Sequence, residues 1–161
     1  MAFGYQQSVA LKNKEAIQGD RANNQEVIYA PTNFTVASGA TAVAVKVGGF
    51  VWRDATNPAT QVAASTIGTD KPLGFMERVQ NHANYDIDTE GTLIVPAGEA
   101  VNVAVKGDFF VAADASVSVG NTVYADPTTG AASFIGTDKT ATDFKAFTSG
   151  ASGDMVIITN R

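Results

Sequence analysis

The sequence predicts an all-β fold: a single β-barrel or β-sandwich domain with an internal pseudo-repeat and an extended N-terminal arm. Three observations indicate this. Short segments rich in Val, Thr and aromatic residues alternate between apolar and polar positions. Turns containing Gly, Pro and Asp separate these segments at short intervals. One pattern of residues also occurs twice along the chain.

The stretch 96–134 shows the strand pattern most clearly. Val101, Val103 and Val105 occupy every second position, which predicts a strand with one buried face. The turn at 126–130 has Asp first, then Pro, and ends in Gly, as a tight connection between paired strands requires. Further strands are expected at 109–111, 122–125 and 131–135, next to the turns of this stretch.

The same reasoning places strands in the rest of the chain. They are expected at 27–29, 34–36, 42–52 (two strands divided by a Gly-Gly break), 73–79, 92–95 and 155–159. The last segment is apolar on both faces, which predicts a central or covered strand. Residues 140–153 are weakly patterned, and no strand is assigned to them.

The repeated pattern, V-x-V-G-x-x-V-W/Y-x-D, occupies 45–54 and 117–126, an offset of 72 residues. Ile-Gly-Thr-Asp-Lys follows each copy, at 67–71 and 135–139, with an offset of 68. Because order and spacing are nearly kept, we infer two equivalent units, and a pseudo-twofold relation is one possible arrangement. Trp52 and Tyr124 are then expected in equivalent, largely buried positions.

Residues 1–25 differ from the domain expected at 26–161, because they are polar and lack alternation. An extended arm and a disordered tail both fit this composition. A tail that only interacts with solvent has no need for large apolar side chains. The five such residues are therefore candidate partner contacts: Phe3, Tyr5, Val9, Leu11 and Ile17.

A sixth candidate contact comes from the neighbouring pair Phe109 and Phe110. Adjacent strand residues point to opposite faces, so one of the two rings points inward and the other outward. We assign the outward ring to Phe110, as a contact for a partner.

Composition and charge limit the functional classes. With 161 residues the chain is one domain, and the absence of cysteine excludes disulfides and thiolate chemistry. The net charge of −5 argues against a nucleic-acid partner. No secretory signal or apolar run of transmembrane length is visible, so no membrane partner is expected. Only 17% of residues are charged, which suits a surface covered in an assembly.

No catalytic, cofactor-binding or metal-binding residue is expected. His82 is the one histidine and lies in a polar stretch, so we interpret it as a loop residue rather than a triad member. Residues 86–91 resemble the start of a calcium loop but lack the acidic twelfth position. Trp52 fits either core packing or stacking on a sugar, and we favour the core because Tyr124 replaces it in the repeat.

The chain resembles the structural cement proteins of tailed bacteriophages, which decorate capsid shells. The matching landmarks occur in order over most of residues 19–135. They are Gly19-Asp20-Arg21-Ala22-Asn23-Asn24, Gly49-Phe50-Val51-Trp52 with Asp54, Pro72-Leu73-Gly74-Phe75-Met76-Glu77-Arg78, Leu93-Ile94-Val95-Pro96-Ala97-Gly98, Gly107-Asp108-Phe109-Phe110-Val111, and Gly120-Asn121-Thr122-Val123-Tyr124-Ala125-Asp126 with Gly130.

This resemblance implies a β-rich decoration protein, often a homotrimer, that binds the HK97-like major capsid protein of an assembled shell. It implies no catalysis and no cofactor. The protein is then expected on the outer capsid surface of the virion, after synthesis in the cytoplasm of the bacterial host. The alternative is a phage tail, fibre or surface β-module that binds carbohydrate, and an exposed aromatic cluster would distinguish it.

Overall fold

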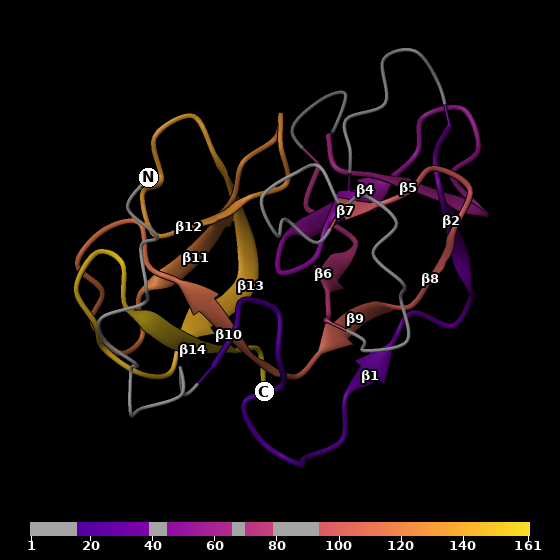
Figure 1. Cartoon of the computed structure of the whole chain (residues 1–161). Helices are drawn as coiled ribbons and strands as arrows, with labels where there is room; N and C mark the ends of the chain where they lie inside the picture. Colours follow the sequence, from indigo (N-terminus) through magenta and orange to yellow (C-terminus); the bar gives the residue numbers. More distant parts are fainter. Residues whose placement is uncertain (1–15, 39–44, 66–69, 79–93) are drawn as a thin grey trace, which may run out of the picture.

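The computed structural model describes residues 16–38, 45–65, 70–78 and 94–161. Within these ranges the chain forms fourteen strands and no helix, which confirms the all-β prediction. The strands build a seven-stranded, a five-stranded and a two-stranded sheet (Figure 1). A helix able to cross a membrane does not occur among the described residues.

The seven-stranded sheet has the order β1-β9-β6-β4-β5-β2-β8. Its neighbours are antiparallel, except that β2 and β5 are parallel. The strands are β1 (Ile28–Tyr29), β2 (Phe34–Val36), β4 (Phe50–Arg53), β5 (Gln61–Ala63), β6 (Gly74–Met76), β8 (Ala100–Val101) and β9 (Val103–Lys106). The separate two-stranded sheet pairs β3 (Val45–Lys46) with β7 (Ile94–Val95).

The five-stranded sheet is antiparallel throughout and has the order β10-β14-β13-β11-β12. Its strands are β10 (Asp108–Ala112), β11 (Thr122–Ala125), β12 (Ala132–Ser133), β13 (Thr140–Ala146) and β14 (Met155–Thr159). β14 lies between β10 and β13, which confirms the central position expected for the last strand. β13 was not expected, although at seven residues it is longer than any other described strand.

The two large sheets pack face to face around an aromatic core. Phe50 and Phe75 come from the seven-stranded sheet, and Phe109 and Phe144 from the five-stranded sheet. All four are buried, and five of their six ring pairs have centroids between 4.7 and 6.2 Å apart. Burying each such side chain contributes roughly 1.5–3 kcal/mol, so this layer fixes the two sheets together as a sandwich. Both strand orders are linear, so the barrel alternative does not describe the fold.

A second core lies on the other face of the seven-stranded sheet. Val51, Met76 and Val103 point into it, together with Phe34 and Val45. The sequence neighbours of Val51, Met76 and Val103 point toward the aromatic core, because successive strand residues face opposite sides. The centre of this sheet is therefore buried on both faces.

The internal repeat extends through both large sheets. The pairing order β1-β9-β6-β4-β5 matches β10-β14-β13-β11-β12, and every pair in both runs is antiparallel. Local details match as well. Asp54 accepts hydrogen bonds from the backbone N–H groups two and three residues on, as Asp126 does in the second unit. Strands β2, β7 and β8 are additions to the first unit, whereas β3 corresponds to residues 117–118, where Val117 forms an isolated bridge with Gly150.

The two units stack in tandem rather than facing each other across a twofold axis. Val51 and Val123 are equivalent, but Val51 points into the second core and Val123 into the aromatic core. Trp52 therefore lies on a face that the second unit covers, and it is 2% exposed. Tyr124 lies on the outer face of the second unit and is only partly buried. The expected burial is thus confirmed for Trp52, whereas Tyr124 is intermediate, so the two equivalent residues differ in how deeply they are buried.

Candidate functional site

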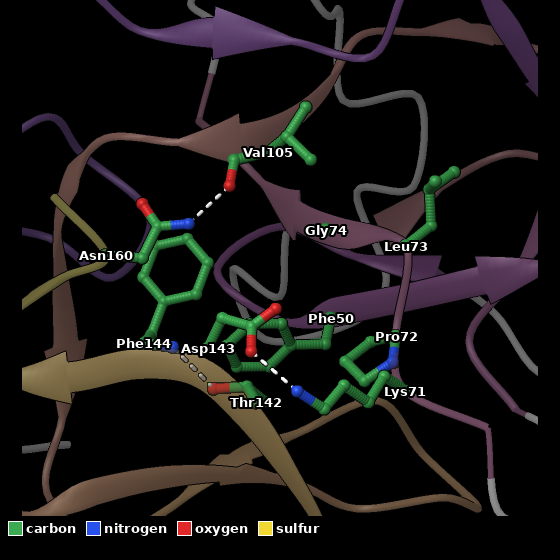
Figure 2. A pocket seen from close by; sticks show the side chains of 10 residues that line it. All are labelled: Phe50, Lys71, Pro72, Leu73, Gly74, Val105, Thr142, Asp143, Phe144 and Asn160. Carbon is green, nitrogen blue, oxygen red and sulfur yellow. Dashed lines mark hydrogen bonds and ion pairs between the residues drawn. The ribbon is translucent and has the colours of Figure 1, made fainter.

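A small cavity lies at the seam between the two sheets (Figure 2). Its volume is about 40 Å³, room for a few waters but not for a sugar or nucleotide. Lys71 Nζ and Asp143 Oδ1 form an ion pair of 2.7 Å at this cavity, and both side chains are mostly exposed. On the opposite side Asn160 donates to the carbonyl of Val105. The cavity is a packing feature of the seam.

The residues considered for chemistry do not form a site in the described part of the chain. His82 and the calcium-like residues 86–91 lie outside the described residues. Within the described ranges, three His, Cys, Asp or Glu side chains are nowhere grouped to hold a metal ion. Trp52 donates its indole N–H to the carbonyl of Asp70 at 2.8 Å and is buried, so its ring is not available to stack on a sugar.

The segment 18–22, here called the inter-sheet clasp, joins the two large sheets. Its backbone forms hydrogen bonds with the outer edge of β10. The Gly19 N–H donates to the Phe110 carbonyl at 2.8 Å, and the Phe110 N–H donates to the Asp20 carbonyl at 2.9 Å. The Gly19 carbonyl accepts from the N–H of Arg78, just after β6, at 2.8 Å. These bonds cover part of the exposed edge of β10, where unpaired backbone groups would otherwise invite association.

Side chains of the clasp are held by charged groups of the first sheet. Arg21 donates to both carboxylate oxygens of Glu77, which is 6% exposed, and to the hydroxyl of Tyr29. The Tyr29 hydroxyl also donates to Glu77. Asp20 pairs with Arg78 at 3.0 Å. A carboxylate this buried requires such partners, because an unpaired buried charge is costly.

Contacts around the clasp shift the pKa values of Arg21 and of its partner Tyr29. The hydrogen bond to Glu77 raises the pKa of Arg21 further above its usual value, despite an opposing effect of burial. Burial, followed by the hydrogen bond to Glu77, raises the pKa of Tyr29. Arg21 is therefore a cation and Tyr29 a neutral hydroxyl throughout the neutral pH range, so the network persists across it.

A second group of polar side chains joins Asn23 and Arg161 to the start of β10. Asp108 is 7% exposed and accepts from Asn23 Nδ2 at 2.7 Å and from Arg161 Nε at 2.8 Å. Burial acts to raise the pKa of Asp108, but hydrogen bonds from Thr159, Asn23 and Arg161 outweigh it, and the net pKa is lowered. The carboxylate therefore stays ionised and ties residues 23 and 161 to the start of the second sheet.

The structure places two of the six candidate contacts. Ile17 is 46% exposed and directly precedes the clasp. Phe110 is partly buried on the outer face of β10, while its neighbour Phe109 is fully buried, as the alternation requires. The clasp brings these two residues into one region. Phe3, Tyr5, Val9 and Leu11 lie outside the described residues.

Sequence reasoning missed two exposed apolar side chains at the far end of the five-stranded sheet. Phe147 is 62% exposed and Val119 is 67% exposed. The bond from Gly120 N–H to the Ala146 carbonyl brings their two segments together. The alternation of Thr142, Phe144 and Ala146 was a signal for β13, and continuing it by one residue would have placed Phe147 on the outer face.

Comparisons with known proteins agree with this architecture. A family model described as "Structural cement protein (E217 gp24/Pam3 gp6)" matches residues 5–160. A chain in the solved structure "The capsid of Myoviridae Phage XM1" is similar in fold, with a TM-score of 0.60 and 18% identity, over 100% of this chain and 98% of that chain. Identity this low shows the fold alone. No curated protein matches by sequence.

Proposed function

The chain belongs to the phage family of structural cement proteins, and from that premise we propose that it binds the major capsid protein on the outer surface of the virion. As a family member it is a virion structural protein that stabilises the phage capsid. The match over residues 5–160 carries this conclusion. The finer proposal adds the partner, an HK97-like coat protein, the outer face of the shell, and synthesis in the host cytoplasm.

The proposed mechanism is thermodynamic. A protein that binds the assembled shell but not the separate coat subunits shifts the equilibrium toward the shell. At about 100-fold excess over Kd this contributes about 2.7 kcal/mol per site. A bound protein that contacts several coat subunits gains further, because its later contacts are intramolecular. Catalysis has no part in this mechanism.

We also propose a homotrimer. The low fraction of charged residues and the exposed Phe147 and Val119 support an oligomer, since exposed apolar side chains at one end of a sheet favour association. A cyclic oligomer would present several equal surfaces to a shell whose coat subunits are themselves repeated. The carbohydrate-binding alternative lacks its expected support, because Trp52 is buried.

The proposed partner contacts are Phe3, Tyr5, Val9, Leu11, Ile17 and Phe110. Their support is that Ile17 is exposed beside the clasp and that Phe110 lies on the outer face of the strand to which the clasp bonds. The clasp holds the base of this region rigidly to both sheets. Less conformational entropy is then lost when a partner binds there.

Purified shells that lack this protein provide the test. Adding the protein should coat assembled shells to saturation and raise the temperature at which they break, while unassembled coat protein should bind at least about 100-fold more weakly. Electron microscopy would locate the added density on the outer surface. Equal binding to unassembled coat protein, or saturated shells that break at the unchanged temperature, would contradict the proposal.

A further inference from the structure

The outer face of the five-stranded sheet carries an apolar stripe, defined as Phe110, Ala112, Phe147, Met155 and Ile157. The strand register places Phe110 opposite Ile157, and Ala112 opposite Met155. The N–H of Phe147 donates to the Ile157 carbonyl at 2.7 Å, which extends the row by one strand. Phe147 is 62% exposed and the other four are partly buried.

The tandem repeat shows that the equivalent face of the first unit is covered. In the first unit, the face that carries Trp52 packs against the second unit through the aromatic core. The equivalent face of the second unit carries Tyr124 and the apolar stripe. None of the three sheets in the described ranges lies behind it, because the small sheet β3–β7 belongs to the other core.

We propose that the apolar stripe is the docking site for the N-terminal segment, residues 1–15, of a neighbouring copy of this chain. This inference rests on the proposed homo-oligomer. The segment has the matching chemistry: Phe3 and Tyr5, and then Val9 and Leu11, are spaced by two, so each extended pair presents one apolar side. Fifteen extended residues span up to about 50 Å, enough to reach a neighbouring molecule.

Charge favours the same pairing. Residues 1–15 contain two lysines and one glutamate, a net charge of +1, whereas residues 16–161 carry −6. The segment is thus a basic, apolar strip attached to an acidic domain. Complementary charge raises the rate of association and disfavours wrong partners.

The oligomer requires the segment to dock on a neighbour rather than on its own chain. If the segment covered its own stripe, the large apolar side chains left exposed on the described surface would be single residues on separate segments: Ile17, Ile28, Val119 and Ile135. A stable interface buries about 1,200–2,000 Å² in total, which scattered residues do not supply. Exchange of segments between copies buries both surfaces at once.

Cysteine pairing tests this directly, because the chain has no cysteine of its own. Two single variants, Tyr5→Cys and Phe147→Cys, are mixed and oxidised at low protein concentration. We expect a heterodimer on a non-reducing gel. The control pair, Tyr5→Cys with Ala55→Cys on the exposed β4–β5 turn, should give none. A double variant, Tyr5→Cys with Phe147→Cys, tests pairing within one chain. The inference is overturned if the double variant forms a disulfide within the chain while the mixture gives no heterodimer. It is also overturned if neither experiment gives a product.

A second measurement follows the oligomer itself. Phe147→Ser should raise the concentration at which half of the oligomer dissociates by about tenfold. The variant lacks an exposed ring that association would bury, so the oligomer loses that contribution to its stability. The matched control Ile135→Ser, which removes an apolar side chain that is 45% exposed elsewhere, should leave it unchanged. Equal effects of both variants would contradict the proposal. If all variants still coat and stabilise shells, only this inference fails and the cement function stands.

Discussion

Two glycines at equivalent repeat positions share a backbone conformation but have different neighbours. Gly48 has φ of +79° and Gly120 has φ of +87°, a region that L residues with a side chain adopt at a cost of about 1–2 kcal/mol. A Cβ at Gly120 would meet nothing within 4 Å. A Cβ at Gly48 would lie 2.3 Å from Cγ of Gln18 and 3.1 Å from the backbone nitrogen of Gly19.

Gly120→Ala should therefore lower the free energy of unfolding by about 1–2 kcal/mol, through backbone strain alone. Gly48→Ala should add roughly 1–3 kcal/mol for the overlap with the clasp. Urea unfolding of the two variants measures the difference. Equal losses would mean that the clasp moves aside freely and does not hold the sheets together.

The lowered pKa of Asp108 predicts a loss of stability in acid. A carboxyl whose pKa is lower in the folded protein than in the unfolded chain stabilises the fold at pH values above its ordinary pKa of 3.8. This contribution is lost as the pH falls through the lower pKa of the folded state. Asp108→Asn should lower the free energy of unfolding at pH 7 and make its decline below about pH 4 shallower. The pKa values of Asp114 and Asp126 are also lowered, so part of the decline in the free energy of unfolding with falling pH should remain in this variant.

Melting temperatures of the wild type and of Asp108→Asn, measured from pH 7 to pH 2, check this prediction. Asp143→Asn is a suitable control, because that carboxylate is mostly exposed and pairs with Lys71, which is also exposed. Curves for Asp108→Asn that run parallel to the wild type over the whole range would contradict the assignment.

At the residue scale, the sequence was informative where alternation decides direction. It placed Phe109 inside and Phe110 outside, and Trp52 in the core. It did not indicate that Tyr124 is less buried than Trp52, because burial there depends on which face of the second unit the first unit covers. That depends on packing between segments about seventy residues apart, which a local pattern does not encode.

At the scale of elements, the inter-sheet clasp should contribute more than the exposed ion pair across the same seam. Glu77→Ala removes a buried carboxylate that accepts from Arg21 and Tyr29, and hydrogen bonds to charged groups contribute about 1.5–3 kcal/mol. Lys71→Ala removes one partner of an exposed pair, expected to contribute about 0–1 kcal/mol. Chemical denaturation of both variants gives the comparison, and a smaller loss for Glu77→Ala than for Lys71→Ala would contradict the role of the clasp.

The two aromatic residues of the repeat should also differ. Trp52→Ala should cost about 3–5 kcal/mol, because the ring is buried and its N–H is bonded. Tyr124→Ala should cost less, about 1–2 kcal/mol, because only part of that side chain is buried. A loss below about 1 kcal/mol for Trp52→Ala would indicate that its ring is accessible in solution.

Strands were predictable where β-branched residues alternate between strong turn signals. The bounds of β11 and β14 follow the sequence closely, since Thr, Val, Tyr and Ile dominate them. β13 was missed because Thr and Ala supply three of its four inner or partly buried positions and only Phe144 is large and apolar. The clasp was visible as a Gly-Asp-Arg motif, but its bonds to Glu77 and Arg78 join residues more than fifty positions apart.

For the whole molecule, the repeat explains why one face of the five-stranded sheet has no covering sheet among the described residues. In the first unit, strands β2, β3, β7 and β8 complete the core on one face, and the second unit buries its inner face against the first unit. A chain of two tandem units therefore ends with the outer face of the second unit. The sequence indicated two equivalent units but not the direction in which they stack. The structure shows this direction, because the equivalent residues Val51 and Val123 point into different cores.

The oligomeric state is the prediction that concerns the whole molecule. If copies associate through surfaces that monomers expose, folding and association are coupled, and the melting temperature should rise with protein concentration. Light scattering should give about three times the chain mass of 16.7 kDa at high concentration. Removal of residues 2–15 should lower both the mass and the concentration dependence, while circular dichroism still shows the β-domain folded. A full-length protein of 16.7 kDa at high concentration, with a melt independent of concentration, would show that the chain meets the shell as a monomer and that its avidity has another source.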